Sequence, residues 1–174
     1  MRVVKTDFPD VFILEPSVYG DSRGWFMESW SAAKMLEAGF DYNFVQDNHS
    51  FSAQKGVLRG IHFQKGEHAQ TKLVRCTQGA VLDVVVELQN KKWIAVELSQ
   101  ENKKQLLIPR GYGHAFLTLT ENVEFLYKAD NFYNASADRS IRWNDPVLSI
   151  DWGIDNPILS DKDAAAPFLE DCDI

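Results

Sequence analysis

Arg59 and His62 interrupt a stretch of sequence, "GVLRGIHFQ" from Gly56 to Gln64, that otherwise has the apolar pattern of a β-strand. A guanidinium group and an imidazole ring are costly to bury unless other groups pair with them. The stretch therefore belongs either to a satisfied structural network or to a site that does chemistry. Residues three apart point to opposite faces of a regular strand, so the two side chains share a pocket only if the backbone is irregular.

Ionisable residues interrupt two further strand-like stretches. "TKLVRCT" contains Lys72 and Arg75, and "VLDVVVEL" contains Asp83 and Glu87. For Glu87 we expect a solvated outer face, the usual location of a charged side chain. Asp83 has two interpretations of equal weight: a solvated face, or the interior of a barrel, where it would pair with a lysine such as Lys72.

The stretch "IPRGYGHAF" carries Pro109, Gly111 and His114 with the spacing P-x-G-x-x-H, which resembles the second signature of the cupin barrels. A histidine in such a turn is a candidate functional group. The first signature of metal-binding cupins supplies two histidines and a glutamate, whereas the corresponding "HFQKGE" has the single histidine His62. His62 and His114 leave too few protein ligands for a mononuclear metal, so we expect no metal site.

Aromatic and charged residues follow in the last third of the chain. Tyr127 and Tyr133 in "EFLYKADNFY" would share a face of a regular strand, either as packing or to donate a proton and to stack on a base. The run "SDKD" is either a surface charge run or part of a site. Five cationic residues could converge on a diphosphate, which guanidinium groups bind bidentately: Arg23, Arg59, Lys72, His114 and Lys162.

Short strands with Gly and Pro turns must position these residues. Such strands recur from Gly56 onward, a pattern that indicates a β-sandwich or barrel. The one good helix candidate is "SAAKMLEAGF", which Ser31 can cap and Gly39 can end. Beyond about Asn131 the pattern becomes irregular, and we expect this segment to pack over the mouth of the barrel. The length of 174 residues fits a single domain, residues 1–174.

Composition limits the partners and the compartment. The formal net charge of −7 argues against nucleic acid or an anionic membrane as the main partner. Cys76 and Cys172 lie far apart without metal-ligand spacing, which suits a reducing cytoplasm. The N-terminal residues have no apolar leader and no stretch is long enough to span a bilayer, so we expect a soluble cytoplasmic protein.

Eight segments in order resemble the dTDP-4-dehydrorhamnose 3,5-epimerase family over essentially the whole chain: "DSRGWFMESW", "FVQDNHS", "GVLRGIHFQ", "HAQTKLVRCTQGAVLDVVVEL", "VELSQENKKQLLIPRGYGHAFLTL", "EFLYKADNFY", "IRWNDPVLSIDW" and "PILSDKD". The resemblance implies a mainly β fold, a cupin-type jelly-roll β-barrel with one or two short peripheral helices and an irregular C-terminal segment. It also implies a homodimer and catalysis without a metal or another cofactor.

Site residues follow from the resemblance position by position. His62 matches the general base, Asp163 the carboxylate that orients it, and Lys72 the residue that stabilises an enolate oxygen. Asp83 lies where the family has a carboxylate near that lysine, and Tyr127 matches the general acid. Tyr133 matches the position that stacks on thymine, and the remaining substrate-contacting positions fall, with Lys72, on Arg23, Glu28, Gln46, Asp47, Asn48, Arg59, His114, Asp138 and Lys162.

The implied reaction converts dTDP-4-dehydro-6-deoxy-D-glucose to dTDP-4-dehydro-L-rhamnose. A carbon-bound proton next to a ketone is weakly acidic, so its removal needs a base and a cation at the oxygen where charge develops. Inversion then needs an acid on the opposite face. Three alternatives stay open: an epimerase that inverts C3 or C5 alone, a metal-dependent cupin enzyme, and a non-catalytic sugar-nucleotide binding module.

Four local expectations complete the sequence interpretation. The loop Gln89–Lys92 is shorter than is usual in the family, which would alter a barrel edge only. Asp138 stands where a glutamate is common, beside the expected nucleotide site. The segment that contains Arg23 and Glu28 is expected to reach the site of a second subunit. Because the resemblance places Arg59 and His62 in one pocket, we predict a bulge at Gly60.

Overall fold

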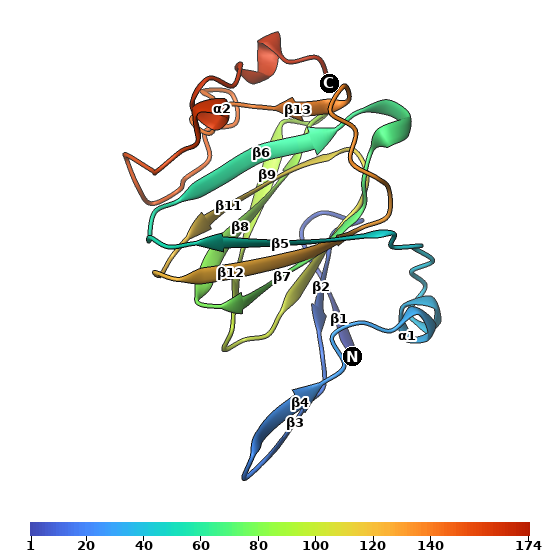
Figure 1. The fold of residues 1–174 in the computed structure, drawn as a ribbon. Helices are drawn as coiled ribbons and strands as arrows, with labels where there is room; N and C mark the ends of the chain where they lie inside the picture. The colour runs from blue at the N-terminus through green and yellow to red at the C-terminus, as the bar shows by residue number, and fades with distance from the viewer.

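Thirteen β-strands and two short α-helices make up the computed structural model, which describes residues 1–174 (Figure 1). The strands are β1 (Arg2–Lys5), β2 (Phe12–Glu15), β3 (Val18–Asp21), β4 (Gly24–Met27), β5 (Gln46–Ser52), β6 (Leu58–Gln64), β7 (Lys72–Gln78), β8 (Ala80–Glu87), β9 (Lys92–Ser99), β10 (Gln105–Ile108), β11 (Tyr112–Thr118), β12 (Val123–Ala129) and β13 (Asp138–Ser140). The helices are α1 (Ala32–Glu37) and α2 (Asp161–Ala164), with single 3₁₀ turns η1 (Gly66–His68) and η2 (Leu169–Asp171).

Two antiparallel sheets form the body of the molecule. The six-stranded sheet has the order β1-β2-β10-β7-β12-β5 and the five-stranded sheet the order β13-β6-β11-β8-β9. Alternate residues of β8 are buried on opposite faces of the five-stranded sheet. Val81 and Val85 pack between the two sheets, whereas Val84 and Val86 pack on the outer face. The arrangement confirms the predicted mainly β, cupin-type jelly roll.

The two outer faces are covered by different segments. The irregular C-terminal segment packs Leu148, Trp152 and Leu169 on the outer face of the five-stranded sheet. The expectation that this segment closes the mouth of the barrel is therefore wrong for most of its length, because its apolar residues find a larger buried surface on the sheet. Helix α1, capped by Ser31 as predicted, places Met35 on the outer face of the six-stranded sheet.

The helices are too short to define layers of their own. Neither α1 nor α2 has the length and the apolar run that crossing a lipid bilayer requires.

The short loop between β8 and β9 forms a tight turn over residues 88–91, in which Lys91 adopts a positive φ of 56°. Glu87 and Lys92 pair directly across that turn, so the shortening leaves the rest of the strand register regular.

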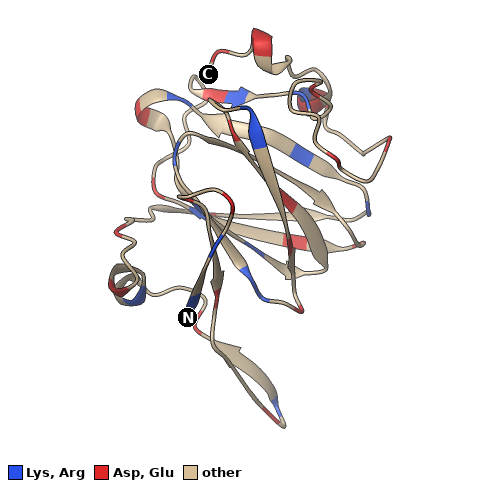
Figure 2. Ribbon diagram, turned by 180° about the vertical axis from the view of Figure 1, so that it is seen from behind, with Lys and Arg blue, Asp and Glu red and all other residues tan.

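The hairpin of β3 and β4 projects away from both sheets (Figure 1). Its tip carries Asp21 and Arg23, and Figure 2 shows acidic and basic segments there, far from the rest of the charged residues. Tyr19 and Phe26 on the hairpin are 67% and 70% exposed. The hairpin thus exposes large apolar side chains that its own chain does not cover.

The predicted bulge at Gly60 is present in β6. His114 pairs with His62 and Phe116 pairs with Arg59, so β6 has one residue more than β11 between the two pairs. Gly60 adopts a φ of +128°, and a Cβ atom on it would lie 2.4 Å from the Cβ of Ala115. The extra residue shifts the alternation of side chains by one position. As a result Leu58, on one side of the bulge, and Ile61 and Phe63, on the other side, all pack on the outer face of the sheet. Arg59 and His62 therefore share the inner face.

Candidate active site

A histidine and a carboxylate from distant parts of the chain meet at the inner face of β6. His62 Nε2 lies 2.5 Å from Asp163 Oδ1 on helix α2, which Ser160 caps through a hydrogen bond to the Asp163 N–H. The His62 side chain is 32% exposed, whereas that of Asp163 is 4% exposed. Burial disfavours the charged form of Asp163, but its hydrogen bonds, led by the one from His62, outweigh that effect and lower its pKa.

Lys72 and Tyr127 face His62 from the opposite sheet. Val74 and Phe125, two residues from each on the same strands, pack in the core between the sheets, which places both side chains on the inner face. Lys72 Nζ lies 5.7 Å from the centre of the Tyr127 ring. Burial lowers the pKa of Lys72 to about 8 and raises that of the Tyr127 phenol. The site thus holds a lysine whose pKa is lowered beside a tyrosine whose pKa is raised.

Asp83 and His114 form a buried pair on the inner face of the five-stranded sheet. His114 Nε2 lies 2.9 Å from Asp83 Oδ2, and the two side chains are 8% and 0% exposed. Of the two interpretations of Asp83, the interior one is correct, but its hydrogen-bond partner is His114 rather than Lys72. The Asp83 charge still raises the pKa of Lys72 and so counteracts part of the effect of burial.

Asp138 connects two further predicted residues at the opening of the site. Its Oδ2 accepts hydrogen bonds from Lys162 Nζ at 2.5 Å and from the Tyr133 hydroxyl at 3.3 Å. The hydrogen bond to Asp138 raises the pKa of Lys162. Strand β12 ends at Ala129, so Tyr133 belongs to the following loop, and the expectation that it continues the same strand face as Tyr127 is wrong.

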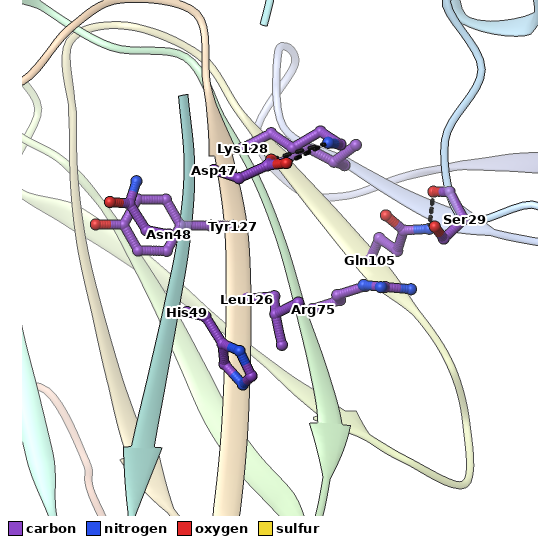
Figure 3. Close-up of a pocket in the computed structure, with 10 residues that line it drawn as sticks. Ser29, Asp47, Asn48, His49, Arg75, Gln105, Leu126, Tyr127 and Lys128 are labelled. Atoms are coloured by element: carbon purple, nitrogen blue, oxygen red, sulfur yellow. Dashed lines mark hydrogen bonds and ion pairs between the residues drawn. The ribbon is translucent and has the colours of Figure 1, made fainter. Parts of the chain in front are cut away.

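Strand β5 divides its predicted residues between the two faces of the sheet. Asn48 pairs with Tyr127 across the strands, and Figure 3 shows both side chains on one side of the sheet. Asp47 lies on the other side, where it binds Lys128 at 2.8 Å in an outer pocket that Arg75 also lines. Gln46 returns to the inner face and accepts a hydrogen bond from the Tyr133 N–H. The structure therefore brings Gln46 and Asn48 to the site, but not the side chain of Asp47.

The predicted arginines and Glu28 lie at different places. Arg59 donates hydrogen bonds to Ser52 Oγ and to the Phe51 carbonyl at the edge of the site. Arg23 pairs with Asp21 at the tip of the projecting hairpin, and Glu28 binds Lys34 of α1 at 2.8 Å. Within one chain, Arg23 and Glu28 thus lack contact with the other site residues.

A family model described as dTDP-4-dehydrorhamnose 3,5-epimerase matches residues 5–171. The chain belongs to this epimerase family. It is 53% identical to the dTDP-4-dehydrorhamnose 3,5-epimerase of Salmonella typhimurium over 177 residues, which cover 98% of this chain and 96% of that protein.

Solved structures of epimerases share the fold. The enzyme from Bacillus anthracis with TDP and PPi bound superimposes with a TM-score of 0.93 at 44% identity, covering 96% of this chain and 98% of that one. The enzyme from Legionella pneumophila, in complex with dTDP-4-keto-L-rhamnose, gives a TM-score of 0.92 at 42% identity over 97% and 93% of the chains. The epimerase family is thus shown by sequence and by fold.

The sequence interpretation did not single out one buried residue beside the candidate site. Gln64, two residues after His62, is 6% exposed and contacts the loop that carries Tyr133. The sequence did contain a signal for it, because a polar residue two positions after His62 shares the inner face of the strand with His62.

Potential metal ligands do not form a cluster in the structure. No group of three or more His, Cys, Asp or Glu side chains gathers in a geometry that could hold an ion.

Proposed function

We propose that the chain catalyses the 3,5-epimerisation of dTDP-4-dehydro-6-deoxy-D-glucose to dTDP-4-dehydro-L-rhamnose, in the cytoplasm. The observation that carries this proposal is that His62 and Tyr127 lie on the inner faces of opposite sheets, with Lys72 beside Tyr127. Inversion at a carbon next to a ketone needs a base on one side and an acid on the other. The relatives named as 3,5-epimerases favour inversion at both centres.

His62 acts as the base in this proposal. Its Nε2–H donates to Asp163, so Nδ1 keeps the lone pair that accepts the proton from carbon. Asp163 has a lowered pKa and stays charged, which stabilises the imidazolium that forms. The carboxylate thus orients the ring and supports its charge without taking the proton.

Lys72 and Tyr127 complete the reaction. As deprotonation moves negative charge onto the ketone oxygen, the Lys72 ammonium stabilises the enolate. Tyr127, whose pKa is raised by burial, holds its proton until the enolate carbon accepts it from the other side. One such cycle inverts one centre, and a second cycle inverts the other after both groups have exchanged protons with water.

The nucleotide binds at the opening of the site in this proposal. Tyr133, 58% exposed, offers an aromatic surface for thymine, and Lys162 beside Asp138 supplies charge for the diphosphate. Arg59 lies on the same inner face as His62 and adds a guanidinium group. The shorter Asp138 side chain, at a position where glutamate is common in the family, would set how Lys162 is presented.

A homodimer would complete the site. Arg23 and Glu28 match substrate-contacting positions but lie on or beside a hairpin that leaves its own barrel. The exposed Tyr19 and Phe26 of that hairpin need a covering surface. Exchange of hairpins between two copies supplies that cover and brings Arg23 to the partner's site, a self-complementary contact typical of two-fold dimers.

Deuterium exchange tests the proposed reaction. The enzyme is incubated with dTDP-4-dehydro-6-deoxy-D-glucose in deuterated water, and exchange at each carbon is followed by NMR. Exchange at C3 and C5 with formation of the L-rhamno product is expected, whereas exchange at one carbon alone would identify a single-site epimerase. Tyr127→Phe should retain exchange but lose inversion.

Metal removal tests the metal-dependent alternative. Full activity after dialysis against a chelator is expected, and a loss of activity that added metal restores would support that alternative.

A further inference from the structure

Tyr133 has an exposed ring on a tightly held backbone. The loop from Asp130 to Ala137 crosses from β12 in one sheet to β13 in the other. Tyr133 is 58% exposed, so packing contributes little to holding its ring in place. The backbone of residues 132–134 is instead bound by side chains from both sheets.

Two glutamines provide these hydrogen bonds. Gln46 of β5 accepts from the Tyr133 N–H at 3.1 Å. Gln64 of β6 donates through Nε2 to the Phe132 carbonyl at 3.2 Å and accepts through Oε1 from the Asn134 N–H at 2.6 Å. Its second amide hydrogen bond reaches the His68 carbonyl at 2.8 Å. The residues on either side of Tyr133 are thus tied to the strand that carries His62.

We propose that Gln64 is a positioning residue, which holds Tyr133 as a preorganised platform for the nucleobase of the substrate. The inference rests on the proposed function, because it takes Tyr133 to stack on the base. Gln64 is 6% exposed, both of its amide hydrogens go to backbone carbonyls and its oxygen accepts from a backbone N–H, so the side chain is used to hold the loop. An aromatic ring fixed in its binding position loses less conformational entropy on binding than one on a mobile loop.

The position of Gln64 also links two parts of the site. Gln64 and His62 lie two residues apart on the inner face of β6, so one strand sets both the base and the loop that would hold the nucleotide. Asp138 pairs with Gln64 across β13 and β6 and binds the Tyr133 hydroxyl. The residues that flank Tyr133 are therefore held by β6, and its hydroxyl is held by β13, the strand that pairs with β6.

Binding of dTDP and of inorganic pyrophosphate separates positioning from general damage. Gln64→Leu removes all the hydrogen bonds of this side chain, and Gln64→Glu keeps its shape but replaces the donors with acceptors. Calorimetry should show dTDP binding weakened roughly three- to tenfold in either variant, the effect of leaving one group to be ordered on binding. Pyrophosphate affinity should not change, and KM should rise with little change in kcat.

A double-mutant cycle makes the test specific to Tyr133. Tyr133→Ala should weaken dTDP binding about tenfold, as loss of a base-stacking ring does. If Gln64 acts through that ring, adding Gln64→Leu to Tyr133→Ala should cause no further loss. Gln78→Leu is the control, because Gln78 also donates an amide hydrogen bond to a loop carbonyl, that of Asn122, at the other end of the barrel.

Three results would overturn the inference: unchanged dTDP affinity in both Gln64 variants, an equal loss of pyrophosphate affinity, or fully additive losses with Tyr133→Ala. If Gln64→Leu does not fold, the dTDP and pyrophosphate affinities of Gln64→Glu decide the test. Failure of the proposed reaction would be distinct, since it would appear as absent deuterium exchange in the unaltered enzyme with dTDP binding intact.

Discussion

His62 and Asp163 are separated by 101 positions in the chain, yet their side chains meet at 2.5 Å. The contact joins the inner face of β6 to the short helix α2 of the C-terminal segment. Asp163 is almost fully buried and has a lowered pKa, whereas His62 remains partly accessible. A buried carboxylate behind an accessible imidazole is the arrangement that makes a histidine an oriented base.

Removal of either partner should abolish most of the activity. His62→Asn should lower kcat on the order of 10²- to 10⁴-fold, the usual contribution of a general base. Asp163→Asn should lower it by a comparable factor, because the amide can hold the wrong tautomer of the ring. Asp161→Asn, on the same helix but exposed, is the control. An Asp163→Asn variant with unaltered kcat would contradict the dyad.

Activity should fall as the pH rises above about 8. Burial lowers the pKa of Lys72 to about 8, so the ammonium group that stabilises the enolate is present below that pH and lost above it. The pKa of Tyr127 is raised, so the tyrosine keeps its proton in this range. A kcat–pH profile checks the alkaline limb. In Lys72→Arg any residual activity should persist to higher pH, because guanidinium stays charged, and an unshifted limb would assign it to another group.

Gly60→Ala should destabilise the fold and misplace the site. The new Cβ atom would meet Ala115 Cβ at 2.4 Å, at a φ of +128° that residues with side chains rarely adopt. The expected loss in the free energy of unfolding is about 2 to 4 kcal/mol, measured by urea denaturation. Gly66→Ala is the matched control, because Gly66 has a φ of +62° with open space around it, and about 1 kcal/mol is expected. Equal losses would mean that the close approach at Gly60 is unimportant.

Mixed dimers should recover activity that neither parent has. Arg23→Ala and His62→Asn are each expected to be nearly inactive. If Arg23 acts on the partner's site, unfolding and refolding an equal mixture gives hybrid dimers with one complete site. The activity should then reach about one quarter of the unaltered enzyme, since half of the dimers are hybrids with one working site of two. If Arg23 served its own subunit, the mixture would remain inactive, and sedimentation of an active monomer would also exclude the exchange.

Local patterns in the sequence were enough for several features. Alternation and turn residues indicated a β fold, and Ser31 marked the start of α1. The resemblance of ordered motifs to the epimerase family identified the jelly roll. Gly60, between Arg59 and His62, which the resemblance placed in one pocket, predicted the bulge. These inferences succeed because hydrophobic period, caps and glycine requirements act within a few residues.

Tertiary packing decided the rest. The sequence by itself left Asp83 between two faces, and only the approach of β11 to β8 made His114 its partner. It placed Tyr133 on the face of Tyr127, although β12 ends before that residue. Nor could it show that Gln64 holds the Tyr133 loop or that Asp47 faces away from the site. Such contacts join residues up to about a hundred positions apart, and they depend on where whole strands end and cross, which no local pattern specifies.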